Sequence, residues 1–207
     1  KMWLVVTSQE KLTEIVGGLD DRRVELARLM DRFPQEIQVH LEPSDISEVT
    51  SKRVLSKKSQ AEQVLRKLFE DNRSALETHT RLSADIQLPR LDAERFMDLY
   101  PLIPYQVDFI IQVVSGLRMQ GGTTRHVGGA NRTIIKLAQQ LLINPAVRLA
   151  DKEIRALATA DQIYDLVDGN IAGEIRGRIA DIRKQVPHKF AQPVAKAVCL
   201  LQFVKSV

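Results

Sequence analysis

Residues 103–119 read IPYQVDFIIQVVSGLRM, and the spacing of their apolar side chains predicts a helix from about Pro104 to Met119. The apolar positions that share one face of this helix are Ile103, Val107, Ile110, Ile111, Val114 and Leu117. A face of this kind is typical of a helix that packs on the hydrophobic core of a globular domain. The segment therefore predicts a helical domain built around it.

Helical spacing recurs along most of the chain after Pro43. Further helices are predicted at about 58–78, 92–100, 132–143, 171–186 and 191–206. Ser44 and Asp45 are good N-caps for the first helix after Pro43, and Asn131 is the predicted cap of the helix that follows it. Pro187 ends the helix before it, because proline disfavours helical geometry at the preceding residue.

The chain up to Pro43 carries a different pattern. Met2 to Val6 form a continuous apolar run, as in a buried parallel strand, and residues 37–41 predict a second strand. A helix at about 19–31 lies between them, and a strand–helix–strand unit predicts a parallel pair in an α/β sheet. Since a buried strand needs neighbours on both sides, we expect the sequence to be an excerpt whose sheet began upstream. The expected fold is mainly α, with a small two-strand parallel α/β remnant followed by an all-helical domain and further helices.

Three parts are predicted: residues 1–43 as the α/β remnant, 44–145 as the helical domain and 146–207 as a helical extension. The extension ends with a helix that is either the first of a winged-helix domain or an ordinary helix capping the helical domain. A chain of 207 residues that is 44% hydrophobic has enough apolar surface for one or two buried cores.

Charge and cysteine content bound the class of protein. The chain has 30 basic and 26 acidic residues, a net charge of +4 that permits contact with nucleic acid without indicating it. The basic clusters at 52–58 and 176–184 are typical of solvated helix faces.

The single cysteine, Cys199, excludes an internal disulfide and lies among apolar neighbours, which indicates a core position in a cytoplasmic protein. No apolar stretch approaches the roughly 18 residues that span a bilayer, so no membrane association is expected.

A glycine-rich segment at residues 121–129 is the first candidate for a ligand site. It has no lysine and does not match G-x-x-x-x-G-K-[ST], so it is predicted to be a flexible loop rather than a phosphate cradle. Arg132 lies in the first turn of the predicted helix that follows, where unpaired N–H groups and the helix dipole favour a phosphate. The four histidines are scattered without metal-ligand spacing, so no metal site is predicted.

Two further candidates lie near the predicted strands. Thr7, Ser8 and Gln9 follow the first strand at its carboxyl end, which is where open α/β sheets bind ligands. The alternative is that Thr7 or Ser8 caps a helix. Arg32 ends the helix before the second strand, and its alternative is a surface cation favoured by the helix C-terminus.

The order of these segments resembles the second half of an AAA+ ATPase. The matching segments are LVVTSQ (4–9), LMDRFP (29–34), LEPSD (41–45) and GGANRTII (128–135). The resemblance implies that Thr7 and Gln9 form sensor 1 at a strand tip and that Arg32 is the arginine finger supplied to a neighbouring subunit. It also implies that Arg132, beside Asn131, is the sensor 2 arginine that contacts the nucleotide from a helical lid.

Other segments look like the large P-loop ATPase of bacteriophage exclusion (BREX) systems, the BrxC/PglY type. These are VTSQEKL (6–12), RFP (32–34), DISEVTSKRVLSKK (45–58) and YPLIPYQ (100–106). The similarity covers residues 1 to about 145, and more loosely the rest. It implies ATP and Mg²⁺ as cofactors of the parent protein, a homo-oligomer joined through the arginine finger, and a role in phage defence. It further implies partners such as a BREX methyltransferase, with DNA as a compatible one.

The Walker A and Walker B motifs of this family are missing from the sequence, so this piece is not expected to hydrolyse ATP by itself. Two alternatives stay open. One is a non-enzymatic helical DNA-binding or adaptor module, supported by the basic clusters and the helical content. The other is the lid of an origin-recognition or clamp-loader ATPase, which differs only in its partners.

Overall fold

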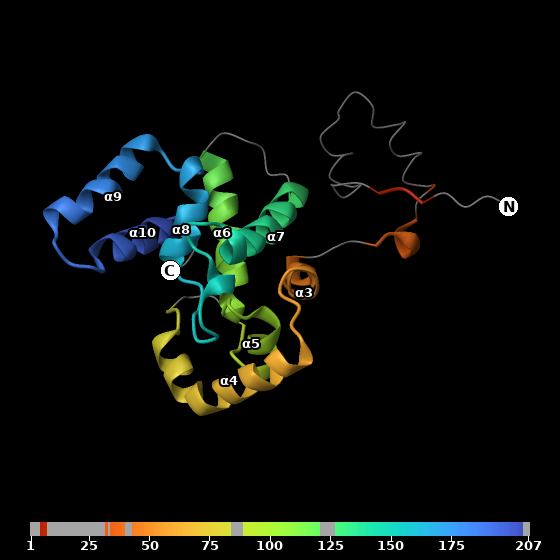
Figure 1. Ribbon diagram of the computed structural model, residues 1–207. Coiled ribbons are helices and arrows are strands. Elements are labelled where there is room, and N and C mark those ends of the chain that lie inside the picture. Colours follow the sequence, from red (N-terminus) through yellow and green to blue (C-terminus); the bar gives the residue numbers. More distant parts are fainter. Residues whose placement is uncertain are drawn as a thin grey trace, which may run out of the picture.

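The computed structural model describes residues 5–7, 32, 34–39, 43–83, 89–120 and 127–204, and it confirms that the chain is mainly α-helical (Figure 1). The α-helices of this part are α3 (Pro43–Arg53), α4 (Ser59–His79), α5 (Ala93–Leu99), α6 (Pro104–Gln120), α7 (Val127–Ile143), α8 (Ala160–Val167), α9 (Gly173–Gln185) and α10 (Ala191–Leu201). Three short 3-10 helices accompany them: η2 (Gln35–Ile37), η3 (Leu149–Asp151) and η4 (Asp168–Asn170). In the part of the chain that is described, none of these helices is long and apolar enough to cross a membrane.

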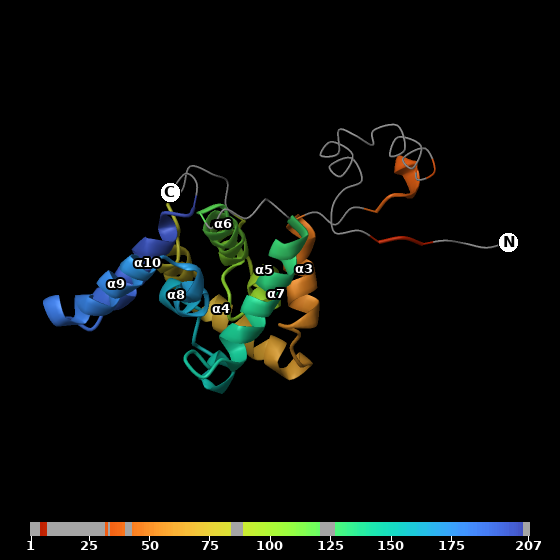
Figure 2. The same cartoon turned by 90° about the horizontal axis from the view of Figure 1, so that it is seen from above.

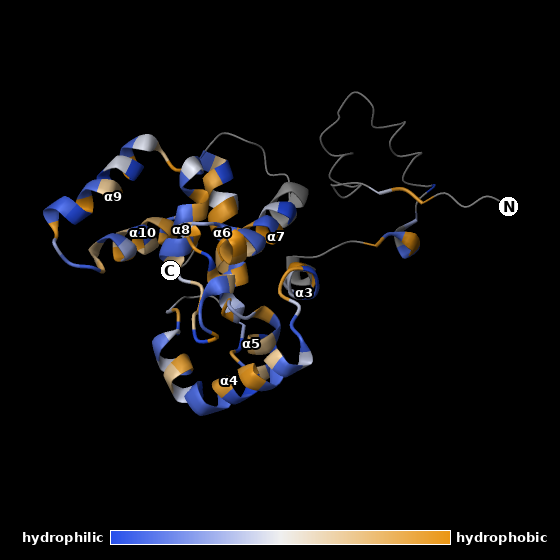
Figure 3. Ribbon diagram, viewed as in Figure 1, coloured by the Kyte–Doolittle hydropathy of each residue, from blue (hydrophilic) through white to orange (hydrophobic). Residues whose placement is uncertain are grey.

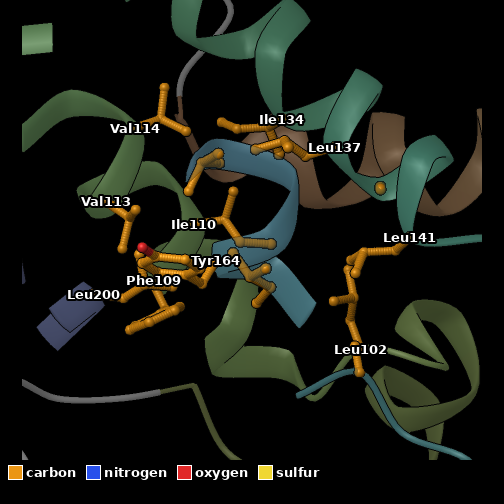
Figure 4. Packing of buried hydrophobic residues seen from close by; sticks show 14 of the residues in the cluster. Leu102, Phe109, Ile110, Val113, Val114, Ile134, Leu137, Leu141, Tyr164 and Leu200 are labelled. Carbon is orange, nitrogen blue, oxygen red and sulfur yellow. The ribbon is translucent and has the colours of Figure 1, made fainter. Parts of the chain in front are cut away.

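Helix α6 lies at the centre of the helical body, as its apolar spacing predicts. Its buried side chains include Val107, Ile110, Val113, Val114 and Leu117. Figure 4 shows Ile110, Val113 and Val114 of α6 in one cluster with labelled residues of α7, α8 and α10. Seen from above, α3 and α7 flank α6 on one side, and α8, α9 and α10 lie on the other (Figure 2). The predicted helices at 58–78, 92–100 and 171–186 are confirmed as α4, α5 and α9 within two residues at each end.

Two hydrophobic clusters hold the body together. The larger cluster runs from Ile46 of α3 to Val204 after α10, so helices on both sides of residue 145 share one core. The smaller cluster joins α4 to α5 through Leu65, Phe69 and Phe96. The rings of Phe69 and Phe96 pack against each other at an angle of 40°, with their centroids 5.3 Å apart. Helix α4 is therefore attached to the body mainly through α5.

The predicted α/β remnant is not seen among the described residues. Val5 and Val6 have no regular structure, and Val5 is 88% exposed. Ile37 ends the 3-10 helix η2, and Val39 after it is 90% exposed, so the expected strand is absent from residues 37–39. A strand needs backbone hydrogen bonds to a neighbouring strand. The described residues contain no strand with which residues 5–6 or 37–39 could pair. The helix predicted at 19–31 and the ends of both predicted strands lie outside the described residues.

The predicted start of the first helix was wrong by one or two residues. Helix α3 begins at Pro43, so Ser44 and Asp45 belong to its first turn and do not cap it. Proline suits the first helical position because its missing N–H would have no partner there in any case. Ser44 and Asp45 are common capping residues, but Pro43 takes the first helical position before them.

The segment between α7 and α8 is tied to the turn between α5 and α6. Gln106 makes two buried hydrogen bonds: its Oε1 accepts from the Ile103 N–H at 2.9 Å, and its Nε2 donates to the Ala158 carbonyl at 2.8 Å. The Ala158 N–H in turn donates to the Pro101 carbonyl at 2.9 Å. The Tyr100 hydroxyl donates to the Ile154 carbonyl at 2.5 Å. The segment between α7 and α8 is not helical, so its buried backbone groups lack helical hydrogen bonds. The bonds described here replace the hydrogen bonds to water that these groups lose on folding.

Gly116 permits a close contact between α6 and Phe203 in the turn after α10. A Cβ at this position would lie 2.9 Å from the Phe203 Cβ. We expect Gly116→Ala to lower the free energy of unfolding by about 1–2 kcal/mol, because overpacking outweighs the gain in helix propensity. Gly177→Ala in α9 is the matched control, since a Cβ there meets nothing within 4 Å. It should raise stability by up to about 1 kcal/mol. Urea unfolding measures both, and a neutral Gly116→Ala would contradict the close contact.

Candidate functional site

A polar groove of about 600 Å³ opens between α6, α7 and α8. Its apolar floor includes Val114, Leu117 and Leu137. The polar groups that line it are Arg118, Thr133, Lys136, Gln140, Asn144, Asp165 and Asn170. A hollow with an apolar base and a few convergent polar groups is the usual form of a small-ligand site.

Helix α7 supplies most of the polar wall. Thr133, Lys136, Gln140 and Asn144 recur at intervals of three and four, which places them along one face of the helix. The buried residues Ile134, Ala138 and Leu141 occupy another face and belong to the main core. The sequence shows this amphipathic pattern. It does not distinguish a polar helix face that lines a groove from one that faces bulk water.

The groove carries more positive than negative charge. Arg118 Nη2 donates a hydrogen bond to Thr133 Oγ1 at 2.8 Å, which links α6 to α7. Lys136 is exposed one turn further along α7. Of the described residues that line the groove, Asp165 alone carries a carboxylate, and it pairs with Lys196 of α10 at 2.5 Å. An arginine and a lysine beside a hydroxyl are suited to hold an anion such as a carboxylate or phosphate.

The lining residues offer binding groups rather than a catalytic pair. Among the described residues, no histidine or cysteine lines the groove. Cys199 is buried, and burial raises the pKa of its thiol, so it stays protonated at neutral pH, as its predicted core position requires. Within the described part of the chain, no cluster of histidine, cysteine and acidic residues could hold a metal ion.

A second polar hollow of about 620 Å³ lies where α3, α5 and α6 meet. Asp108 lines it, and partial burial raises the pKa of that carboxyl. Lys57 lines an adjoining hollow, where burial lowers the pKa of its amine to about 8 and its Nζ donates to the Asp98 carbonyl at 2.7 Å. That bond caps the last turn of α5, which gives Lys57 a structural role.

The predicted sensor and finger residues are exposed where they are described. Thr7 is exposed and has no regular secondary structure, and Arg32 is exposed and helical. Gln9 lies outside the described residues. Among the described residues, no hydrogen bond or ion pair joins Thr7, Arg32 and Arg132. The structure therefore places these side chains at the surface without bringing them together.

The predicted start of the sensor 2 helix was wrong. Helix α7 begins at Val127 rather than after Asn131, so Asn131 and Arg132 lie in its second turn and Asn131 does not cap it. The unpaired N–H groups of a helix belong to its first four residues, and Arg132 follows them. Arg132 keeps an exposed side chain one turn before Lys136. Glycine pairs usually interrupt helices, which is why the helix was predicted to start after Gly128 and Gly129. In the structure both glycines are helical. The rest of the glycine-rich segment, residues 121–126, lies outside the described residues.

No protein-family model matches this chain, and no solved structure matches it.

Proposed function

We propose that this chain is part of an AAA+ ATPase of the BREX phage-defence type, supplying groups that sense and trigger ATP rather than hold its phosphates. The order of four segments carries the proposal: the strand tip with Thr7, the segment with Arg32, the start of the helical body near Pro43 and the helix with Arg132. The predominance of helix after Pro43 agrees with a lid domain. The missing Walker motifs limit the activity of this piece alone.

In this proposal, residues 1–43 belong to the α/β core of the ATPase, whose sheet forms one side of the nucleotide site. ATP with Mg²⁺ supplies the phosphoryl group and binds between that sheet and the helical body. Thr7 and Gln9 orient the attacking water, and Arg132 contacts the phosphates of its own subunit. Arg32 reaches the ATP of the next subunit. The exposure of Thr7, Arg32 and Arg132 supports these roles, since each must contact a group outside the helical body.

The proposed assembly is a cytoplasmic homo-oligomer, because an arginine finger acts on a neighbouring subunit. A BREX methyltransferase and DNA are the proposed partners of the assembly. Closure of the helical body on ATP would then pass the nucleotide state to these partners.

The contribution of Arg132 tests the proposal in the complete protein. We expect Arg132→Ala to weaken ATP binding by roughly tenfold to a hundredfold, the usual loss when a hydrogen bond to a charged group is removed. Arg155→Ala is a suitable control, because Arg155 is also an exposed arginine but lies outside α7. Calorimetric titration with a non-hydrolysable ATP analogue measures the affinity. Equal affinities for both variants would contradict a phosphate contact by Arg132.

A non-enzymatic helical binding module is the second candidate, and the basic surface of α9 and the turn after it favours it. The two candidates differ in one measurement. The complete protein binds ATP if the first is right, and shows no ATP binding if the second is right.

A further inference from the structure

The outer face of α10 exposes three large apolar side chains in a row. Phe190, Val194 and Val198 are 55%, 57% and 60% exposed, and their spacing of four places them on one side of the helix. The opposite side buries Cys199 and Leu200 against the core. Other exposed apolar residues of the described chain, such as Ile143 and Met119, occur singly, which is normal for a protein surface. We call the three residues the α10 stripe.

Helix α10 packs on α8 and α9, and the stripe faces neither of them. Figure 1 shows α9 and α10 side by side at the edge of the body, and Figure 3 shows the apolar character of α10 beside the largely hydrophilic α9. Within the described residues, nothing covers the stripe.

A basic cluster lies at the N-terminal end of the stripe. The stretch 183–189, from the last turn of α9 to the start of α10, carries three basic residues, Arg183, Lys184 and Lys189, and no acidic one. Arg183 lies in the last turn of α9, and Lys189 precedes the stripe with its Nζ 4.8 Å from the centroid of the Phe190 ring. Lys184 pairs with Asp181 at 2.7 Å. Arg183 and Lys189 have no carboxylate within ion-pair distance among the described residues.

We propose that the α10 stripe and this basic cluster bind an acidic amphipathic helix of a partner protein. Apolar side chains spaced by three and four residues on that helix would pack on Val194 and Val198. Carboxylates at its edge would meet Arg183 and Lys189, which fixes the direction of the bound helix and speeds the encounter. This interaction does not depend on ATP and goes beyond the proposed ATPase role.

Two other occupants fit the observations less well. In an antiparallel pair with a second copy, the basic cluster would meet Leu201 and Gln202 at the other end of α10, and neither carries a negative charge. Nucleic acid would use the basic cluster through its phosphates but would leave Val194 and Val198 exposed to water. A partner with both apolar and acidic groups satisfies the whole surface.

The test uses the 207-residue chain and a fluorescent helical peptide of about 18 residues, long enough for helix formation on binding. The peptide carries leucines at intervals of three and four with glutamates beside them, and a control peptide has lysine for each glutamate. Fluorescence anisotropy at low and high salt gives the affinities. We expect the glutamate peptide to bind at least about tenfold more tightly than the lysine peptide, with the difference shrinking at high salt.

Variants of the stripe and of the basic cluster separate the two contributions. The double variant Val194→Ser with Val198→Ser should weaken binding of the glutamate peptide by about tenfold or more, whereas Ile143→Ser, at another exposed apolar residue, should not. Arg183→Glu with Lys189→Glu should abolish the preference for glutamate. Failure of the glutamate peptide to bind would overturn the proposal. So would duplex DNA or anionic vesicles binding the basic cluster with no effect of the valine changes, or a dimer that the valine changes dissolve.

Discussion

Replacing Arg32 by alanine in the complete protein is expected to abolish ATP turnover while leaving ATP binding largely intact. An arginine placed on the transferring phosphate from a neighbouring subunit stabilises the charge that develops in the transition state, and its removal costs about 10³–10⁵ in rate. In the proposed assembly, ATP binding survives because the finger comes from the next subunit and contributes little to binding of ATP in the ground state. Arg32 is exposed, as a residue acting outside its own subunit must be.

Mixing the two arginine variants would separate a finger from an ordinary surface cation. If Arg32 acts on the neighbouring site and Arg132 on its own, mixed oligomers of Arg32→Ala and Arg132→Ala contain some sites with both arginines. Such mixtures should recover part of the turnover that each variant lacks alone. Phosphate release at a fixed total protein concentration measures the recovery. Unchanged turnover in Arg32→Ala would remove the finger assignment, whatever the mixtures show.

Phe96→Ala is expected to lower the free energy of unfolding by about 3–5 kcal/mol, the usual loss for a fully buried phenylalanine. Phe96 is 1% exposed and is the centre of the smaller core cluster, with its ring 5.3 Å from Phe69 and 5.7 Å from Tyr100. A cavity at this point leaves α4 with little to pack on. Urea unfolding measures the loss, and hydrogen exchange should show the fastest opening in residues 59–79.

Phe190→Ala is the matched control, because it removes the same side chain from an exposed position. It should change the free energy of unfolding by no more than about 0.5 kcal/mol. Similar losses for the two variants would show that the α4–α5 cluster contributes little to the stability of the body.

The long helices could be predicted because each carries its own evidence. Helix α6 needs only the spacing of its apolar residues, and its buried face agrees with that spacing. Helix α8 has eight residues, which is about two turns, and its pattern was too short to separate from its surroundings. The start of α7 was missed for a different reason: Gly128 and Gly129 are poor helix formers, and the packing of a whole helix can outweigh such local preferences.

The predicted strands and the groove could not be settled from the sequence, because both depend on neighbours. An apolar run such as Met2 to Val6 indicates burial but does not say which strand would pair with it. The groove requires Arg118 of α6 and Asn170 of η4 to approach the polar face of α7, and these residues are far apart in the sequence. The candidate residues Thr7, Arg32 and Arg132 came from the order of segments, and that order contains no distances.

The short helix α8 contacts both α7 and α10, and its Tyr164 is buried with Leu200 of α10 and Leu137 of α7 in one core (Figure 4). Close-packed interiors of this kind deform little. A displacement of α10 must therefore carry α8 and α7 with it. The helical body would move as one rigid unit, so a displacement of the surface around Val198 would also displace the surface around Arg132.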